Sequence, residues 1–271
     1  MDKSHRRTII VSGNCQASFL YKTLVESPVL RREYRLLRHR NFKSREQDSL
    51  ALEDFSKCAI LLEQISHKAP ELPNKEHIPA DCRVITFPVL WMNILWPMEV
   101  DDPRNKPTEQ YPAGPFPYGD RTILEWLDAG DSPETAARRY LETDIREKAD
   151  LQRYYEINFA KAEQLDRRAD IQFLKYVYDN FRDNQLFVSR NHPSMPMLRY
   201  MRQTVYDALD VPAPESDLSW PSGGMGDIHV PIHPTVAAHL NLRWYDPEAT
   251  YKYFSEQLTP FEYYRRYAAF T

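Results

Sequence analysis

The sequence has little cysteine, little glycine and no long apolar run. Its three cysteines are an odd number and lie in or beside short apolar segments. That usage argues against the disulfide framework of a secreted protein and favours a reducing compartment. No stretch approaches the roughly 18 consecutive apolar residues of a membrane span, and the first apolar run is too short for the core of a signal peptide. These absences predict a soluble, cytoplasmic protein.

An excess of charge of either sign is also missing. The chain has 35 Lys and Arg residues against 39 Asp and Glu, for a formal net charge of -4. No overall basic field therefore points to nucleic acid, although local arginine pairs could meet an anionic small molecule. Neither the phosphate-loop pattern Gly-x-x-x-x-Gly-Lys-Ser/Thr nor the dinucleotide pattern Gly-x-Gly-x-x-Gly occurs.

What the sequence does contain first is a strand, a sharp turn and a helix. Residues 8–11 are β-branched and favour a buried strand, and residues 12–14 suit a tight turn. From Ala17 the apolar residues recur at helical spacing. Cys15 would then see unpaired backbone N–H groups and the positive end of the helix dipole, which favour the reactive thiolate. The alternative is a small buried residue that fills the corner between strand and helix.

The rest of the chain alternates strands with helices. We predict further strands at residues 33–38, 58–62, 83–88 and 185–189, and helices at 45–56, 195–209, 235–241 and from Thr259 onward. This alternation predicts an α/β fold with a mainly parallel, doubly wound sheet, in esterase-like or flavodoxin-like strand order. We expect a single domain over residues 1–271, with residues 120–182 as a helical insertion in which Ser132–Pro133 caps the start of a helix.

Two long loops interrupt this pattern. Residues 88–119 hold seven prolines alternating with aromatic residues, so they cannot form a regular helix or a central strand. We expect an ordered loop that forms a pocket wall or lid, or that packs for stability alone. Residues 210–234 hold Gly223, Gly224 and Gly226, which indicates a mobile or tightly folded turn.

The carboxyl ends of parallel strands meet at one edge of a sheet, where ligands bind. Polar side chains follow several of the predicted strands there: Asn14, Cys15, Gln16, Glu63, Gln64, Arg190, Asn191 and His192. A thiol and an imidazole at one rim suit acyl transfer, with backbone N–H groups and the amides of Asn14 or Gln64 holding an oxyanion. A residue that orients the imidazole is not identifiable, and Asp227 and Glu63 are guesses.

Two other histidines compete with His192 for the role of functional imidazole. His192 directly follows a predicted strand, whereas His229 and His233 follow a loop of unknown path. The spacing of that pair suits metal ligands on a helix, but Pro231 lies between them and no third ligand is near. We therefore favour His192 and expect no metal site.

The motifs at these strand ends resemble those of the WcbI-type polysaccharide-biosynthesis proteins of bacterial capsule gene clusters. The segments that carry the resemblance are Ser12-Gly13-Asn14-Cys15-Gln16, Gln64, Thr86-Phe87-Pro88, Asn191-His192-Pro193 and Val230-Pro231-Ile232. The resemblance covers most of the chain in motif order, and its most specific element is Gly-Asn-Cys-Gln after the first strand. The opening also resembles the Gly-Asp-Ser turn of lipase-like esterases, as a short analogy.

The resemblance implies an acetyltransferase that binds coenzyme A and O-acetylates a sugar of a capsular polysaccharide. It assigns Cys15 as nucleophile or site residue and His192 as its partner. The cofactor-binding candidates are Gly13, Asn14, Gln16, Gln64, Arg190 and Asn191. Either Cys15 carries the acetyl group, or His192 activates the sugar hydroxyl and Cys15 only shapes the site. The partners would be acyl-CoA and a saccharide acceptor, with room for peripheral association with a capsule-assembly complex.

Two other functions fit the same residues. One is an esterase-like thiol hydrolase of acylated glycans, which would turn over a simple ester without coenzyme A. The other is a non-catalytic glycan- or nucleotide-binding protein, in which replacing Cys15 or His192 would leave the biological output unchanged.

Overall fold

The computed structural model describes residues 6–41, 48, 50–67, 72–216, 218 and 226–270. The chain divides into two compact units, and each is described by itself. Unit 1 comprises Met1–Leu90, Ala160–Asp179 and Met195–Ser219; unit 2 comprises Trp91–Phe159, Asn180–Ser194 and Trp220–Thr271. The prediction of one domain with an insertion over residues 120–182 stays a prediction.

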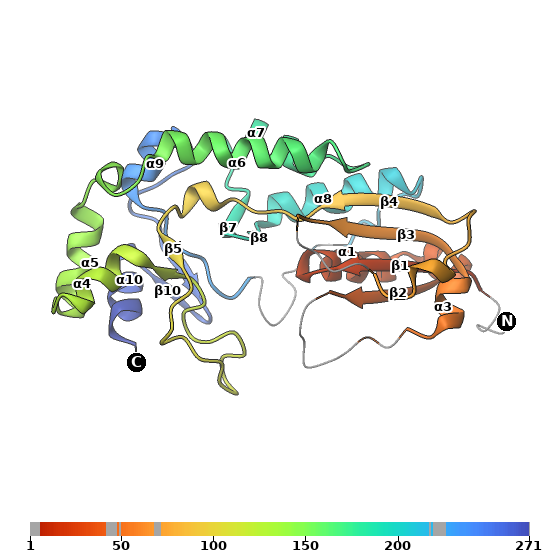
Figure 1. The fold of residues 1–271 in the computed structure, drawn as a ribbon, viewed down its shortest axis with the longest axis horizontal. Helices are drawn as coiled ribbons and strands as arrows, with labels where there is room; N and C mark the ends of the chain where they lie inside the picture. Colours follow the sequence, from red (N-terminus) through yellow and green to blue (C-terminus); the bar gives the residue numbers. More distant parts are fainter. Residues whose placement is uncertain are drawn as a thin grey trace. The chain divides into compact units, whose positions relative to one another are not determined.

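Unit 1 is built on a four-stranded parallel sheet in the order β2-β1-β3-β4 (Figure 1). Its strands are β1 (Thr8–Gly13), β2 (Arg35–Arg40), β3 (Cys58–Ile65) and β4 (Arg83–Pro88). The predicted α/β fold with a parallel sheet is therefore confirmed, and the strand order is of the flavodoxin type. The edge strand β2 is rich in arginine, which protects its open side against pairing with another chain.

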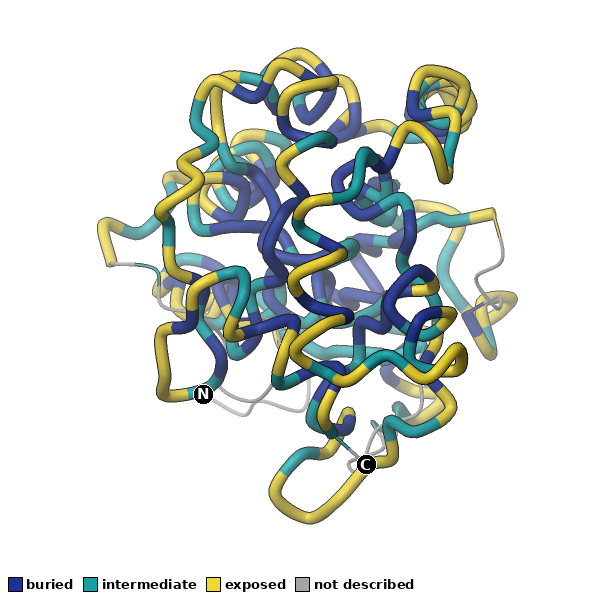
Figure 2. Tube along the Cα trace, turned by 90° about the vertical axis from the view of Figure 1, so that its left-hand side faces the viewer, coloured by how far each residue is buried: buried dark blue, intermediate teal, exposed yellow. Residues whose placement is uncertain are grey.

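The central strand β1 supplies the core of unit 1. Ile9, Ile10 and Val11 are completely buried. Figure 2 colours the chain by burial, with buried residues in dark blue. Alternate residues of a strand point to opposite faces, and Ile10 packs in a cluster with Phe55 and Leu61. The helices of this unit are α1 (Cys15–Glu26), α2 (Pro28–Glu33), α3 (Leu52–Ser56) and α8 (Met195–Ala208), with the short η2 (Lys75–His77).

Helix α3 is shorter than expected. The charged segment 45–56 predicted one helix, but in the described part of that segment only Leu52–Ser56 is helical. Residues 45–47 and 49 of the prediction lie outside the described residues. The short helix is held by its own cap, because the backbone N–H of Ala51 donates to the carboxylate of Asp54 at 2.9 Å.

Unit 2 contains most of the predicted helical segment. Its helices are α4 (Arg121–Asp128), α5 (Pro133–Glu142), η3 (Asn93–Leu95), η4 (Ile145–Glu147), α9 (Pro234–Leu240) and α10 (Pro260–Ala269). Helices α6 (Leu151–Asp166) and α7 (Phe173–Asn180) contribute residues to both units. The predicted caps are confirmed: Ser132 accepts from the N–H of Thr135, and Thr259 and Glu262 form a capping box.

The strands of unit 2 form short antiparallel pairs. They are β5 (Glu99–Val100) with β6 (Gly119–Asp120), β7 (Phe187–Ser189) with β8 (His192–Pro193), and β9 (Tyr251–Tyr253) with β10 (Glu256–Leu258). The strand predicted at residues 185–189 therefore exists as β7, but its place in the parallel sheet was wrong. Only two residues separate β7 from β8, so the chain folds back on itself instead of crossing over a sheet.

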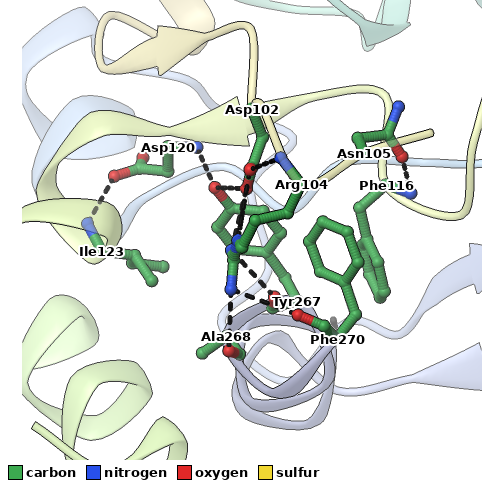
Figure 3. A network of polar contacts seen from close by, with 9 residues as sticks. All are labelled: Asp102, Arg104, Asn105, Phe116, Asp120, Ile123, Tyr267, Ala268 and Phe270. Carbon is green, nitrogen blue, oxygen red and sulfur yellow. Dashed lines mark hydrogen bonds and ion pairs between the residues drawn. The ribbon is translucent and has the colours of Figure 1, made fainter. Parts of the chain in front are cut away.

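The proline-rich segment 88–119 is ordered, as predicted. The guanidinium of Arg104 donates to Asp102 at 2.8 Å and to the carbonyl oxygens of Ala268 and Phe270 at 3.2 Å (Figure 3). The hydroxyl of Tyr267 donates to Asp102 at 2.9 Å and accepts from the N–H of Asp120 at 2.8 Å. These bonds tie the segment to α10.

The glycine-rich loop at residues 210–234 is described only in part, because Gly223 and Gly224 lie outside the described residues. Among the residues that are described, no helix combines the length and the apolar character needed to cross a bilayer.

Candidate active site

Cys15 is the first residue of α1, and only Asn14 separates it from the end of β1, as the sequence predicts. Asn14 is the N-cap of this helix, and its side-chain oxygen accepts from the N–H of Gln16 at 2.8 Å. The backbone N–H of Ala17 has no hydrogen-bond acceptor among the described residues, and the N–H of Cys15 bonds its own thiol. The first turn of α1 therefore keeps a donor available beside the thiol.

Gly13 allows the turn to lie against the end of β3. Its φ is +155°, and a Cβ atom there would lie 2.6 Å from Cβ of Gln64 and 2.7 Å from Cβ of Ala17. Carbon atoms do not approach so closely without displacement. A side chain at position 13 would therefore push Gln64 or the helix out of place.

The amides of Gln16 and Gln64 form a closed network that fixes this turn. The Oε1 atom of Gln64 accepts from the N–H of Asn14 at 2.9 Å, and its Nε2 donates to Oε1 of Gln16 at 3.0 Å. Gln16 also bonds both backbone groups of Leu90, at 2.8 and 2.9 Å. Five predicted site residues are thus brought together in unit 1: Gly13, Asn14, Cys15, Gln16 and Gln64. Their role in binding a cofactor stays a prediction.

The prediction that Cys15 favours the thiolate was wrong. Burial raises the pKa of the Cys15 thiol from 9.0 to about 11, and the backbone hydrogen bonds from Gln16 and Cys15 only partly offset this. The thiol is therefore the neutral S–H form at pH 7. The sequence shows the helix start but not the depth at which the sulfur is buried.

His192 lies at the start of β8 in unit 2, after a turn formed by Arg190 and Asn191. Its Nδ1 atom shares a hydrogen bond of 2.8 Å with the hydroxyl of Tyr118. Burial lowers the pKa of His192 from 6.5 to about 4; Asp227 raises it and Arg190 lowers it further by smaller amounts. The ring is thus neutral at pH 7 and can accept a proton.

Arg190 is held by Glu99. Its Nε atom lies 3.1 Å from Oε1 of Glu99, a carboxylate only 6% exposed, and its carbonyl oxygen accepts from the N–H of Met92 at 2.7 Å. Glu99 lies opposite Asp120 in the β5–β6 pair. Burial raises the pKa of Glu99 to about 7, although Arg190 opposes the shift. Arg190 is therefore paired with the Glu99 carboxyl, whose pKa lies near neutral pH.

His233 and Glu63, two other residues considered for the site, bond to other groups. His233 caps α9, since its Nδ1 accepts from the N–H of Thr235 at 3.1 Å, and its Nε2 lies 2.7 Å from the carbonyl oxygen of Tyr140. Glu63, one of the two guesses for the orienting residue, pairs with Lys75 at 2.7 Å. No group of three His, Cys, Asp or Glu side chains able to hold a metal occurs within the described ranges.

Sequence reasoning missed Tyr118 and Glu99. Glu99 begins β5 and Tyr118 directly precedes β6, within the proline-rich segment, where no periodic pattern marks a strand. The expectation that Arg190, Asn191 and His192 follow a strand of the parallel sheet was wrong, because β7 pairs with β8 instead. Cys15 belongs to unit 1 and His192 to unit 2, so their joint action stays a prediction.

Comparisons with known proteins agree on one family. The family model of the polysaccharide biosynthesis enzyme WcbI matches residues 8–214. No curated protein matches the chain. A solved structure of WcbI has a TM-score of 0.65 at 19% identity, covering 98% of this chain and 94% of that one, and so shares the fold. That structure is described as the native protein without a disulfide bond between coenzyme A and one of its cysteines. The chain therefore belongs to the WcbI family of polysaccharide biosynthesis enzymes.

Proposed function

We propose that this protein is a coenzyme A-dependent O-acetyltransferase that acts on a sugar of a bacterial capsular polysaccharide. The observation that carries the proposal is the thiol of Cys15 at the first turn of α1, fixed by the Gln16–Gln64 network at the carboxyl end of the sheet. This is where ligands bind in parallel α/β folds. Family membership supports a role in polysaccharide synthesis.

Coenzyme A would place its sulfur beside Cys15. The WcbI structure is described as lacking a disulfide bond between coenzyme A and one of its cysteines, and such a bond is open to formation only where the two sulfur atoms come close together. We infer that Cys15 occupies the corresponding place here. Arg190 remains the candidate for a phosphate of the cofactor, because its planar fork suits phosphate oxygens, and its pairing with Glu99 would hold the fork in one orientation.

The neutral state of both groups favours direct transfer over an acetyl-cysteine intermediate. With a pKa of about 11, only about one thiol in 10⁴ is thiolate at pH 7, and the thiolate is the nucleophile. In direct transfer, the imidazole of His192 takes the proton from a sugar hydroxyl, and the sugar oxygen attacks the thioester carbonyl. The C–S bond then breaks, and the departing sulfur of coenzyme A receives the proton from the imidazolium.

The surrounding groups would assist this step. If Nδ1–H of His192 donates to Tyr118, the Nε2 atom is free to accept the proton from the sugar. The N–H group of Ala17 would stabilise the oxyanion of the tetrahedral intermediate. Asn14, Gln16 and Gln64 would act as positioning residues, because their amides hold the turn.

The test is release of coenzyme A thiol from acetyl-CoA in the presence of a panel of methyl glycosides, with acetylated sugar identified by mass spectrometry. We expect transfer that His192→Ala abolishes, and no acetyl-sized mass increase on the intact protein. An increase that Cys15→Ala removes would replace direct transfer by the acetyl-cysteine route. Turnover of 4-nitrophenyl acetate with no use of acetyl-CoA would instead indicate the thiol hydrolase.

A further inference from the structure

A pocket of about 460 Å³ lies in unit 1 on the side away from Cys15. Three arginines line it: Arg6 before β1, Arg31 in α2 and Arg35 at the start of β2. Arg35 lies opposite Thr8 in the β1–β2 register. The pocket is therefore at the amino end of β1, whereas Cys15 follows its carboxyl end. A strand of six residues spans about 20 Å, so the pocket is separate from the proposed active site.

The charge of this pocket contrasts with that of the whole chain. Its lining residues carry three guanidinium groups and no carboxylate, whereas the chain has a net charge of -4. Arg6 donates to the carbonyl oxygen of Arg31 at 2.7 Å, which holds the two residues together. Arg35 pairs with Asp54 at 2.5 Å, which neutralises part of the charge. The side chain of Arg31 has no ion-pair partner among the described residues, so it remains available to an anion.

The remaining lining is aromatic and apolar. Tyr21 from α1 and Tyr34 after α2 line the pocket, together with Val25 and Leu36. The guanidinium of Arg38 lies 5.4 Å from the centroid of the Tyr21 ring and thereby fixes it. Aromatic surface beside guanidinium groups suits a ligand that joins a planar ring to phosphates. A free phosphate would leave the tyrosines unused.

We propose that this arginine pocket binds a nucleoside diphosphate. Arg6 and Arg31, with the part of the Arg35 charge that Asp54 leaves, supply positive charge for two linked phosphates, since arginine forks bind phosphate oxygens two at a time. The tyrosines supply a surface on which the base can stack. The volume lies within the range of about 300–1,000 Å³ that is typical of small-molecule sites. A nucleoside diphosphate is the group that activates sugars for transfer, which is a chemistry compatible with polysaccharide synthesis.

The chain offers a matched pair of double variants. Arg6→Ala/Arg31→Ala removes two charges from the pocket. Arg7→Ala/Arg32→Ala removes two charges from the adjacent positions, where Arg7 pairs with Asp81 and Arg32 with Glu33 instead. Arg7, Arg31 and Arg32 are exposed and Arg6 is half-buried, and none lies in the core, so both proteins should fold, as a thermal melt would confirm. Both variants change the net charge equally, so only a local site distinguishes them.

The experiment is calorimetric titration of the protein with uridine 5′-diphosphate, adenosine 5′-diphosphate, uridine and inorganic pyrophosphate. We expect at least one diphosphate nucleotide to bind below millimolar concentration and more tightly than pyrophosphate, and uridine not to bind. The pocket variant should lose at least about tenfold in affinity, and the neighbouring variant should lose less than about twofold.

Other results overturn the proposal. One is that neither nucleotide binds at millimolar concentration. Another is that the two double variants lose equal amounts of affinity. A third is that pyrophosphate binds as tightly as the nucleotides. Displacement of the nucleotide by coenzyme A, or loss of binding in Cys15→Ser, would place it in the proposed active site instead. The proposal does not depend on acetyl transfer, so binding here and failure of transfer are separate outcomes.

Discussion

In unit 1, Cys15 lies in a turn that is held by hydrogen bonds between the side-chain amides of Gln16 and Gln64. In unit 2, His192 lies in the β7–β8 hairpin and shares a hydrogen bond with the hydroxyl of Tyr118, from the proline-rich segment. The first arrangement joins strand ends within one parallel sheet. The second joins a two-residue strand to a residue of the proline-rich segment. Local strand and turn patterns therefore indicate where the Cys15 turn lies, although its bonds to Gln64 and Leu90 are long-range. No such local pattern indicates the hairpin that carries His192.

Both regions nevertheless keep their reactive group neutral by the same physical cause. Burial raises the pKa of the thiol to about 11 and lowers that of the imidazole to about 4. A thiolate–imidazolium pair of the cysteine-protease kind is therefore not favoured at pH 7. In the proposed transferase, the imidazole would work as a base and the thiol would lie beside the reacting sulfur.

The largest expected effect separates these two roles. His192→Ala should lower the rate of acetyl transfer by about 10²–10⁴-fold, because a positioned general base contributes that much. Cys15→Ala should lower it by about tenfold or less, equivalent to about 1.4 kcal/mol. The measurement is kcat/KM for acetyl-CoA in each variant, with His229→Ala as a control in unit 2. Equal losses in the Cys15 and His192 variants would show that the thiol is the nucleophile.

The next effect concerns the stability of the Cys15 turn. Gly13→Ala should lower the free energy of unfolding by about 3 kcal/mol, because its Cβ would overlap Gln64 and Ala17 in an unfavourable backbone conformation. Gly130→Ala in unit 2 is the control. There φ is +96° but no atom lies within 4 Å, so only the backbone cost of about 1–2 kcal/mol remains. Urea denaturation measures the free energy of unfolding of both variants. Similar losses of stability in Gly13→Ala and Gly130→Ala would rule out the close contact at Gly13.

A pH-dependent effect should arise in unit 2 from Glu99. Its pKa is raised from 4.5 to about 7, so the folded protein binds the proton more tightly than the unfolded chain. The stabilisation from this group is present below about pH 4.5 and is lost as the pH rises to about 7, by about 3 kcal/mol.

Glu99→Gln should remove this dependence, so that the variant gains stability relative to wild type between pH 4.5 and 7. Urea denaturation at half-unit steps of pH provides the measurement. The exposed Glu125 supplies the matched control, Glu125→Gln. A constant difference between Glu99→Gln and wild type across this range would show that the Glu99 carboxyl is not held protonated by burial.

The smallest expected effect tests the bond between the hairpin and the loop. Tyr118→Phe removes the hydroxyl that lies 2.8 Å from Nδ1 of His192. Acetyl transfer should fall about tenfold, because a buried hydrogen bond of this kind contributes about 1–1.5 kcal/mol and here orients the imidazole. In the control, Tyr253→Phe, the lost hydroxyl donates to Pro115 instead. Equal rates in Tyr118→Phe and wild type would show that Tyr118 does not position the ring.

The sequence predicts the sheet and the Cys15 half of the proposed site well because both depend on local patterns. The apolar run of β1, the turn after it and the helix start at Cys15 all have a signature within ten residues. Likewise, Thr259 and Glu262 mark the start of α10 through the capping-box spacing.

The other half is not predictable in the same way. Arg190 and Asn191 are not one of the strong hairpin dipeptides, so the reversal between β7 and β8 has no clear signal. Glu99 meets Arg190 across 91 residues, and its partner strand has only two residues. The pKa of Cys15 depends on burial by the whole unit, which outweighs the local effect of the helix start.

The most direct test of the account is a crystal structure of the protein with bound coenzyme A. We predict that the sulfur of coenzyme A lies in contact with Sγ of Cys15, at about 4 Å, and that Nε2 of His192 reaches the same sulfur directly or through one water. A complex in which that sulfur lies away from Cys15, or in which the His192 ring faces elsewhere, would contradict the proposed transferase.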